Sequence, residues 1–320
     1  MRQQERHSLR FRKFRNTLIA LCLALGWVTI SYPAWDSAGE WPGGAQAQIA
    51  NSRHSLDFSD KSRELYVNLK AALVIDNERG EVLYAKNAEQ LRSIASISKL
   101  LMAITLLDLK YNRDSLIAIT RDDMRRSSKS SFYRGDLVRA EDLFIASLVG
   151  SDNRAARALG RTFGGSYQDF AGKMNETALR LGLRHTSVVE PTGLNADNRS
   201  TAADCALLAN RALMYPEIVR ASKLRRHTVN VTNRRGKPRM RKVGATNLLV
   251  YSRYKTLIAK TGYIRASDYC LTTVLENKQG QRLTIVALGA PWSRTRFKEA
   301  RRLAEFGFRK LNQKRNSPKS

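Results

Sequence analysis

The sequence is poor in cysteine and histidine, which limits the chemistry that the protein can use. Its 320 residues include three cysteines, of which Cys22 lies in an N-terminal apolar run. Cys205 and Cys270 do not make a disulfide framework; they could pair in an oxidising compartment, but we expect two buried free thiols. The four histidines show no pattern of partners: His7, His54, His185 and His227. We therefore predict no metal site, no cofactor and no catalytic histidine.

Acidic residues are also scarce. The chain has 28 Asp and Glu against 56 Lys and Arg, a formal net charge of +28 at pH 7. The first 47 residues hold six of the basic and three of the acidic residues, so 50 against 25, or +25, belong to the rest of the chain. A balance of this kind usually indicates nucleic acid, an anionic membrane surface or another polyanion as a partner.

One long stretch contains no acidic residue at all. Between Glu217 and Asp268 the sequence has fourteen Lys and Arg. A nucleic-acid-binding protein would have such a stretch, but no recognition-helix pattern and no interleaved aromatic residues accompany it here. We therefore predict no nucleic acid partner.

The N-terminal apolar run is too short to predict a membrane-spanning helix. It covers the fourteen residues from Thr17 to Ile30, whereas a spanning helix needs about 20. A basic segment precedes it, and Ala45-Gln46-Ala47 is a cleavage site of the A-x-A type, seventeen residues further on. We expect export to the periplasm, with residues 1–47 as a cleaved signal peptide or an uncleaved anchor.

The remaining pattern predicts one α+β domain over residues 62–313, between a lead-in at 48–61 and a basic tail at 314–320. Strands are predicted at 69–76, 81–86, 227–231, 238–243, 255–259, 268–276 and 282–289. Helices are predicted at 96–106, 141–148, 154–163, 166–181, 201–214 and 295–312. The helical block thus interrupts one antiparallel sheet, and no repeat or linker divides the domain.

Ser96 and Lys99 lie three residues apart at the predicted start of an apolar helix. On a helix both side chains would project from one face of the first turn. A serine at a helix N-terminus has backbone N–H groups and a positive potential nearby. A lysine beside it accepts the hydroxyl proton only if burial or a neighbouring cation lowers the lysine pKa. By itself the spacing is equally typical of a capped helix with a solvated lysine.

Two further motifs follow in order. Ser151-Asp152-Asn153 lies in a predicted loop between helices, 55 residues after Ser96, and Lys260-Thr261-Gly262 lies on a predicted inner strand, 109 residues after Ser151. Each tripeptide is common, since the second is typical of a helix cap before Arg154 and the third of an ordinary strand end. The ordered trio is typical of penicillin-binding proteins and class A β-lactamases.

The sequence resembles the low-molecular-mass penicillin-binding proteins, which are serine D-alanyl-D-alanine peptidases, and most of all their penicillin-binding protein 7/8 endopeptidase group. The resemblance covers roughly residues 60–312. It lies in SIASISKLLMA (93–103), DLFIASLVGSDNRAARALGR (142–161), VVEPTGL (188–194), ATNLLVY (245–251) and KTGYIRASDYC (260–270). It implies a β-lactamase/transpeptidase-like fold, with a five-stranded antiparallel sheet flanked by helices and an inserted all-helical lobe.

The resemblance also implies catalytic roles. Ser96 would attack an amide carbonyl next to a D-alanine and form an acyl-enzyme. Lys99, kept neutral by burial and by Lys260, would accept the serine proton. Ser151 would relay a proton to the leaving amine, and Asn153 would hold the substrate backbone or orient Lys99.

Substrate binding is implied for the third motif and for the strand that carries it. Lys260 and Thr261 would bind a substrate carboxylate, and Gly262 would allow close approach to a strand edge. The oxyanion hole would combine the N–H of Ser96 with that of Tyr263 or Ile264. Arg296, after the last strand, is predicted as a further carboxylate ligand, although arginines in such a place more often form a solvated face.

The predicted partners are peptidoglycan stem peptides, with β-lactams as covalent inhibitors. The stem peptides carry carboxylates, so the basic region 223–242 is predicted to hold an anionic wall surface. One alternative is a class A-like β-lactamase, whose glutamate base stands in a Glu-x-x-x-Asn loop; the segment from Glu190 to Asn195 is one residue too long for that pattern. The other is a non-catalytic wall-binding protein, against which the intact motif residues argue.

Overall fold

The computed structural model describes residues 57–124 and 130–316. The signal or anchor predicted at 1–47 and most of the predicted lead-in lie outside these residues, as does the end of the basic tail. Among the described residues, no helix is both long enough and apolar enough to cross a membrane. Cys205 and Cys270 are free and buried, which confirms the prediction for them.

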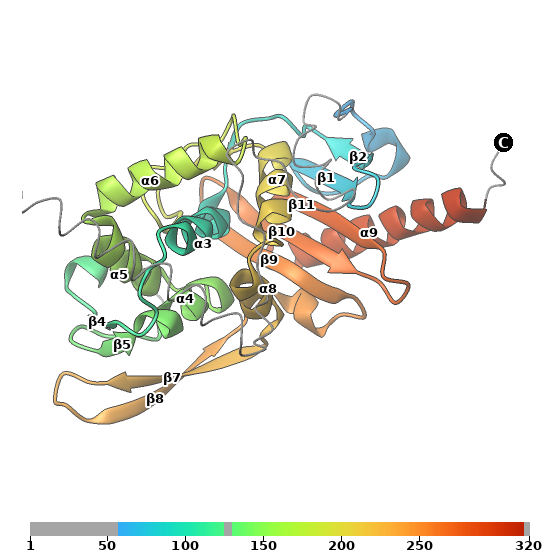
Figure 1. The fold of residues 1–320 in the computed structure, drawn as a ribbon. Coiled ribbons are helices and arrows are strands. Elements are labelled where there is room, and N and C mark those ends of the chain that lie inside the picture. Colours follow the sequence, from blue (N-terminus) through green and yellow to red (C-terminus); the bar gives the residue numbers. More distant parts are fainter. Residues whose placement is uncertain (1–56, 125–129, 317–320) are drawn as a thin grey trace, which may run out of the picture. The chain divides into compact units, whose positions relative to one another are not determined.

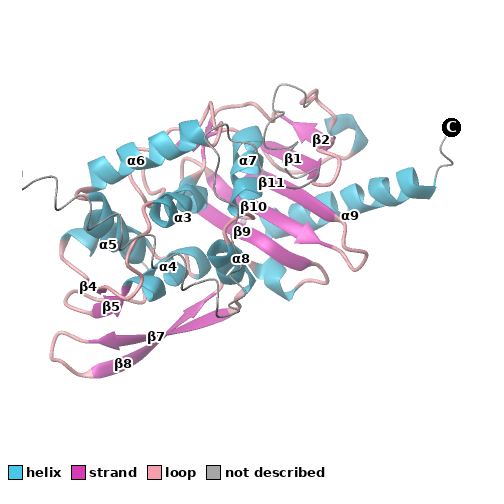
Figure 2. Ribbon diagram, in the orientation of Figure 1, coloured by secondary structure: helices cyan, strands magenta, loops and turns pink. Residues whose placement is uncertain are grey.

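A five-stranded antiparallel sheet carries helices on both faces (Figures 1 and 2). Its strand order is β2-β1-β11-β10-β9. The strands are β1 (Ala71–Asp76), β2 (Val82–Lys86), β9 (Lys255–Ile264), β10 (Asp268–Glu276) and β11 (Arg282–Ala290). The predicted five-stranded sheet is therefore confirmed, but β9 is an edge strand and the prediction of an inner strand for Lys260-Thr261-Gly262 was wrong.

The composition of β1 explains why the sheet is buried between helices. All six residues of β1 are buried apolar or carboxylate side chains. Val74 lies in one cluster with Phe297 of α9 (Ser293–Asn316), and Leu73 lies in another with α7 (Ala202–Ala212). Because successive side chains of a strand point to opposite faces, a strand that is apolar on both faces needs cover on both.

The other helices form the lobe that is inserted between β2 and β9. They are α3 (Ser98–Asp108), α4 (Ala140–Val149), α5 (Asn153–Gly164), α6 (Tyr167–Arg180) and α8 (Pro216–Lys223). The central helix of the lobe is α3, whose residues from Ser98 to Leu106 are all buried among α4, α5, α6 and α7. The helix α3 was predicted from the sequence, whereas the short helix α8 was not.

Helix starts agree with the caps read from the sequence, and one helix end does not. Ser166 caps α6 and Thr201 caps α7 through the backbone N–H three residues on. The last helix, α9, continues to Asn316 instead of ending at Asn312. Short elements complete the chain: β3 (Arg92–Ser93) pairs with β6 (Arg199–Ser200), and 3-10 turns lie at Ser62–Glu64, Ala95–Ile97, Asp122–Met124 and Leu248–Tyr251.

A second, four-stranded sheet has the order β4-β5-β7-β8. Its strands are β4 (Leu116–Ala118), β5 (Leu137–Arg139), β7 (Arg226–Thr232) and β8 (Pro238–Gly244). The hairpin of β7 and β8 was predicted from its turn, and it pairs with β5 of the helical lobe. Val243 at the end of β8 packs under Gly150, where a Cβ would lie 2.4 Å from a Val243 methyl, so the hairpin begins next to the second motif.

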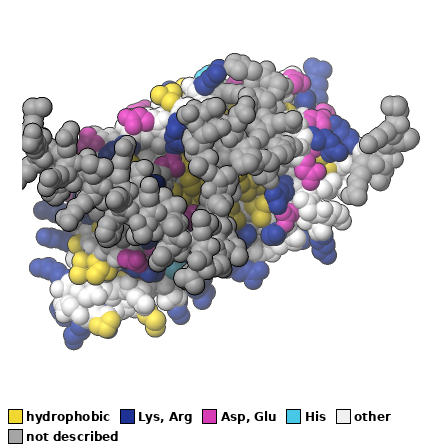
Figure 3. Space-filling view, in the orientation of Figure 1, with side chains coloured by type: hydrophobic (Ala, Val, Ile, Leu, Met, Phe, Trp, Pro, Cys, Tyr) yellow, Lys and Arg dark blue, Asp and Glu magenta, His cyan; other side chains and the backbone are white. Residues whose placement is uncertain are grey.

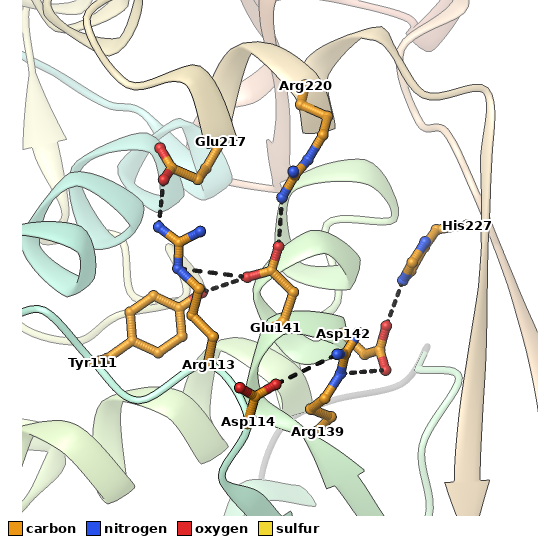
Figure 4. Close-up of polar contacts among 9 residues, drawn as sticks. All are labelled: Tyr111, Arg113, Asp114, Arg139, Glu141, Asp142, Glu217, Arg220 and His227. Carbon is orange, nitrogen blue, oxygen red and sulfur yellow. Dashed lines mark hydrogen bonds and ion pairs between the residues drawn. The ribbon is translucent and has the colours of Figure 1, made fainter. Parts of the chain in front are cut away.

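Two carboxylates of α4 connect the hairpin and α8 to the lobe (Figure 4). Asp142 Oδ1 lies 2.8 Å from Nε2 of His227 in β7. Glu141 accepts hydrogen bonds from Arg220 of α8 at 2.6 Å and from the Tyr111 hydroxyl at 3.2 Å. Since Glu141 and Asp142 are largely buried, these contacts fix the base of the hairpin against the helix that leads to the second motif.

The junction of α5 and α6 tests the packing of this lobe. A Cβ added at Gly164 would lie 2.3 Å from Cβ of the buried Phe170. We expect Gly164→Ala to lower the free energy of unfolding by about 1–3 kcal/mol because the helices must separate. Urea unfolding measures this difference.

Gly172→Ala is the matched control, because Gly172 lies on the exposed side of α6 with no atom within 4 Å of an added Cβ. We expect it to raise the free energy of unfolding by about 0.5–1 kcal/mol through helix propensity. Equal effects of the two substitutions would contradict the packing described for α5 and α6.

Candidate active site

Ser96 lies in a 3-10 turn, and the α-helix begins two residues later. The prediction that the helix starts near Ser96 is corrected by the turn Ala95–Ile97, which precedes α3. Ala95 has a φ of +48°, a left-handed conformation that interrupts a regular helix start. The hydroxyl of Ser96 is thereby presented at the side of α3.

Two glycines allow other segments to press against this turn. A Cβ at Gly193, whose φ is +80°, would lie 2.1 Å from the carbonyl oxygen of Ala95. A Cβ at Gly262 of β9 would lie 2.8 Å from the oxygen of Ile94 and 3.1 Å from the nitrogen of Ser96. Any side chain at either position would displace the backbone that carries Ser96.

Lys99 is fully buried and its amino group faces three oxygens. Nζ lies 2.8 Å from Ser96 Oγ, 2.6 Å from Asn153 Oδ1 and 2.5 Å from the carbonyl oxygen of Thr192. The Ser96 hydroxyl also lies 3.0 Å from the same Thr192 oxygen. Sequence reasoning found the first three residues and missed Thr192, whose contribution is a main-chain oxygen with no signature of its own.

These contacts determine where the protons lie in each state of Lys99. A neutral amine has two N–H donors and one lone pair, whereas a carbonyl and an amide oxygen only accept. The Thr192 and Asn153 oxygens therefore take both N–H groups, and the lone pair is left for the hydroxyl proton of Ser96. When Lys99 is protonated, its third N–H donates to Ser96 Oγ, and the Ser96 hydroxyl donates to the carbonyl oxygen of Thr192.

Burial is the main reason that Lys99 can act as a base. It lowers the Lys99 pKa to about 7, and Arg157 lowers this pKa further, while Glu190 and Asp152 raise it. Lys260, which was expected to share in keeping Lys99 neutral, is not among the causes of this shift, and burial has the main effect. Burial also lowers the pKa of Lys260, and the charges of Lys99 and Arg296 act in the same direction.

The second motif places one side chain on each side of the site. Ser151 has a φ of +56°, and its Oγ accepts a hydrogen bond of 2.8 Å from Lys260 Nζ. Asn153, the first residue of α5, faces Lys99. Asp152 between them caps α5 by accepting from the N–H groups of Arg154 and Ala155, so the cap belongs to the aspartate and leaves the serine for Lys260.

The aspartate cap also fixes the preceding loop. Its carboxylate accepts hydrogen bonds of 2.8 Å from Ser130 Oγ and from the N–H of Ser131. The second motif is therefore attached to the loop before β5 as well as to α5. Asp152 therefore has a structural role in the second motif.

The third motif lies on the edge strand β9, next to the turn that carries Ser96. Lys260 and Thr261 are both buried. Thr261 Oγ1 lies 2.7 Å from Thr246 Oγ1, and the N–H of Thr246 donates to the carbonyl of Val149 at 3.0 Å. Thr246, which sequence reasoning did not single out as a site residue, thus connects β9 to the end of α4.

Arg296 lies at the start of α9 beside the last residue of the third motif. Its Nη1 donates to the carbonyl oxygens of Gly262 at 3.1 Å and Cys270 at 3.4 Å. Its guanidinium carbon lies 5.4 Å from the centre of the Tyr269 ring, and burial lowers its pKa to about 10. These contacts fix the guanidinium to the backbone of β9 and β10, and binding of a carboxylate remains a prediction.

The chain is similar to proteins of known family. A family model described as D-alanyl-D-alanine carboxypeptidase matches residues 59–292. The chain belongs to this family. The D-alanyl-D-alanine endopeptidase of Escherichia coli is similar to it, 32% identical over 238 residues, which cover 73% of this chain and 75% of the relative. The predicted resemblance and the predicted class, a serine D-alanyl-D-alanine peptidase, are confirmed.

Two solved structures of similar fold support the D-alanyl-D-alanine carboxypeptidase family assignment. The Streptomyces K15 DD-transpeptidase superposes with a TM-score of 0.71 and 25% identity, covering 76% of this chain and 98% of that one. Penicillin-binding protein D2 of Listeria monocytogenes, solved in its ampicillin-bound form, gives 0.65 and 31%, covering 76% and 99%. The predicted β-lactamase/transpeptidase-like fold is therefore confirmed.

The paired lysines make a pH-dependent prediction for this family member. Since a pKa near 7 leaves Lys99 protonated in acid, the rate of acylation by a fluorescent penicillin should rise with pH through about 7. Coulombic coupling is reciprocal, so Lys260→Met, which removes a like charge, should raise the Lys99 pKa and move this rise to higher pH. Stopped-flow labelling across pH measures the shift.

Lys260→Arg serves as the control, because it keeps the positive charge and should leave the midpoint of the pH profile in place even if the rate falls. A midpoint that does not move in Lys260→Met would mean that Lys260 has no part in setting the pKa of Lys99.

Proposed function

We propose that this protein is a periplasmic endopeptidase and carboxypeptidase that cleaves stem-peptide cross-links of peptidoglycan through an acyl-enzyme on Ser96. The observation that carries the proposal is the buried contact of 2.8 Å between Lys99 Nζ and Ser96 Oγ, with both N–H groups of the neutral amine held elsewhere. An exported protein is supported by the basic and apolar N-terminal segments of the sequence.

In the acylation step Lys99 takes the hydroxyl proton as Ser96 Oγ forms a bond to the amide carbonyl carbon of a D-alanine residue. The carbonyl π electrons move to its oxygen. Ser151, which accepts a hydrogen bond from Lys260, passes its hydroxyl proton to the amine as the C–N bond breaks, and the proton that Lys99 took from Ser96 replaces it. Water then attacks the ester, releases the peptide carboxylate and restores Ser96.

The oxyanion would lie between the N–H groups of Ser96 and Tyr263. The sequence left Tyr263 and Ile264 as alternatives. The N–H of Ile264 donates to Ser267 Oγ at 3.1 Å on the β10 side. Since successive N–H groups of a strand point to opposite sides, that of Tyr263 points to the free edge of β9, which favours Tyr263.

The substrate would extend along the free edge of β9 as an added strand. Lys260 and Thr261 would bind its carboxylate, and Gly262 allows β9 to lie close to the turn that carries Ser96. Arg296 holds the carbonyl of Gly262 from the other side. We propose that it positions this end of the edge and contributes its charge to carboxylate binding.

A class A-like β-lactamase is the alternative enzyme, and it needs a glutamate that activates water. Here both carboxylate oxygens of Glu190 accept hydrogen bonds from the N–H groups of the four residues 192–195. These donors occupy both oxygens of the carboxylate, which leaves neither directed at a water molecule. The geometry therefore favours a long-lived penicillin adduct over rapid turnover.

The exposed hairpin of β7 and β8 would hold the anionic wall. The residues 234–240 are all exposed and contain Arg234, Arg235, Lys237 and Arg239 without an acidic neighbour. Lys and Arg side chains also outnumber Asp and Glu on the described part of the face in Figure 3. Because the hairpin begins beside the second motif, wall carboxylates bound along it would lie near the catalytic serine.

The chemistry is tested with fluorescent penicillin and with purified cross-linked muropeptide dimers. Wild-type protein should be labelled stably, because Ser96 forms a slowly hydrolysed ester with the β-lactam. It should also convert the dimers to monomers. Ser96→Ala should lose both activities. Gel fluorescence and chromatography provide the measurements.

The outcomes separate the three functions. Rapid turnover of the penicillin would indicate a β-lactamase. Absence of labelling and of cleavage in a folded wild-type protein would indicate a wall-binding protein without catalysis.

The hairpin is tested by sedimentation with purified sacculi. We expect Arg234→Glu, Arg235→Glu and Lys237→Glu together to reduce binding at least tenfold, because each reversal turns attraction into repulsion. Binding of the wild type should also weaken as salt screens these charges.

A triple variant of exposed residues on α9 is the control: Lys298→Glu, Arg301→Glu and Arg309→Glu. It makes the same change in net charge and should bind much better than the hairpin variant. Equal losses in both variants, or binding that ignores salt, would rule out the hairpin as the wall-binding surface.

A further inference from the structure

The loop that follows α6 is built around one carboxylate. Oε2 of Glu190 accepts from the N–H of Thr192 at 2.8 Å and from its hydroxyl at 2.5 Å. Oε1 accepts from the N–H groups of Gly193 at 2.6 Å, Leu194 at 2.9 Å and Asn195 at 3.3 Å. Four successive N–H groups therefore converge on one side chain.

This convergence dictates where the carbonyl groups point. In a chain that turns its N–H groups inward, the carbonyl groups between them face outward. The outward oxygen of Thr192 is the one that meets Lys99 Nζ and Ser96 Oγ. The next residue, Gly193, lies against the carbonyl of Ala95, so the same arch also supports the turn of the nucleophile.

A second group ties the loop to the same turn. Asn198 Nδ2 donates to the carbonyl oxygen of Glu190 at 2.8 Å, and its Oδ1 accepts from the N–H of Val189 at 2.9 Å. The carbonyl oxygen of Asn198 accepts from the N–H of Ile94 at 3.1 Å. The loop is thus closed at both ends on the segment that precedes Ser96.

We propose that Glu190 is a positioning residue for acylation, which holds the Thr192 carbonyl so that the lone pair of Lys99 is directed at Ser96. The proposal rests on the proposed acyl-enzyme function. Glu190 itself makes no hydrogen bond to Ser96 or Lys99 among the described residues, and it acts through the backbone of Thr192. It is not a base for deacylation.

The negative charge of Glu190 has a second, separable effect. It opposes the burial that lowers the Lys99 pKa. Removing the charge while keeping the side-chain size should therefore lower that pKa. The two effects can therefore be measured separately. Displacing the Thr192 carbonyl lowers the plateau rate of acylation, whereas removing the charge of Glu190 moves the pH at which acylation begins.

The experiment compares acylation rates by fluorescent penicillin across pH for the full chain and three variants. Glu190→Gln should lower the plateau rate by roughly 100-fold, the usual cost of displacing a reacting group by an ångström, and should shift the rise of the rate to lower pH. Thr192→Val removes the hydroxyl, which donates to Glu190 and accepts from the N–H of Leu194, and it keeps the charge. It should lower the plateau by about fivefold without moving the midpoint.

Asp197→Asn is the matched control, since Asp197 is an exposed carboxylate on the same loop that takes no part in the arch. It should leave both the plateau and the midpoint in place. Thermal unfolding of each variant shows whether it is folded, and only the folded fraction is counted in the rate.

The outcomes decide the proposal. A normal plateau and midpoint in Glu190→Gln, with slower release of the penicilloyl group, would overturn it in favour of a deacylation base. A lower plateau in a folded variant with an unmoved midpoint would overturn the electrostatic part. If the wild type itself is not labelled, it is the acyl-enzyme function that fails.

Discussion

The amino group of Lys99 among three oxygens is the contact on which the rest of the site depends. Two of its partners, the Thr192 carbonyl and Asn153 Oδ1, are pure acceptors, and the third is the Ser96 hydroxyl. The acceptors hold the N–H groups of the neutral amine, so its lone pair has one partner left. Burial makes this neutral state accessible near pH 7. The neutral amine of Lys99 is therefore held with its lone pair toward the Ser96 hydroxyl, which it activates.

The fold brings together four segments to build this contact. The segment that runs from the turn Ala95–Ile97 into α3 supplies Ser96 and Lys99. The start of α5 supplies Asn153, the arch of 190–195 supplies the carbonyl, and edge strand β9 closes the far side. Gly193 and Gly262 permit the last two to approach the turn. With the helical lobe inserted between β2 and β9, the turn before α3 lies beside the edge strand β9.

Most of the architecture and most side chains of the site could be predicted from the sequence. Short apolar runs predicted the strands, and capping residues predicted the starts of α6 and α7. The five-stranded sheet, and which side chains of the three motifs would meet, were implied by the family resemblance. The Thr192 carbonyl was missed because a main-chain oxygen has no residue type of its own. The turn at Ser96 was predicted as α-helix because the left-handed Ala95 depends on Gly193 and Gly262 from distant segments. Similarly, the edge position of β9 follows from strand order, which local periodicity does not contain.

The central claim concerns the protonation state of Lys99, and an NMR titration of lysine side-chain nitrogens tests it directly. Protein labelled with 15N-lysine would be titrated from pH 5 to pH 11, with the signals of Lys99 and Lys260 distinguished by Lys260→Arg. The account predicts that Lys99 loses its proton near pH 7, well below the ordinary lysine value of about 10.4. A Lys99 signal that stays in the ammonium form up to pH 10 would contradict it.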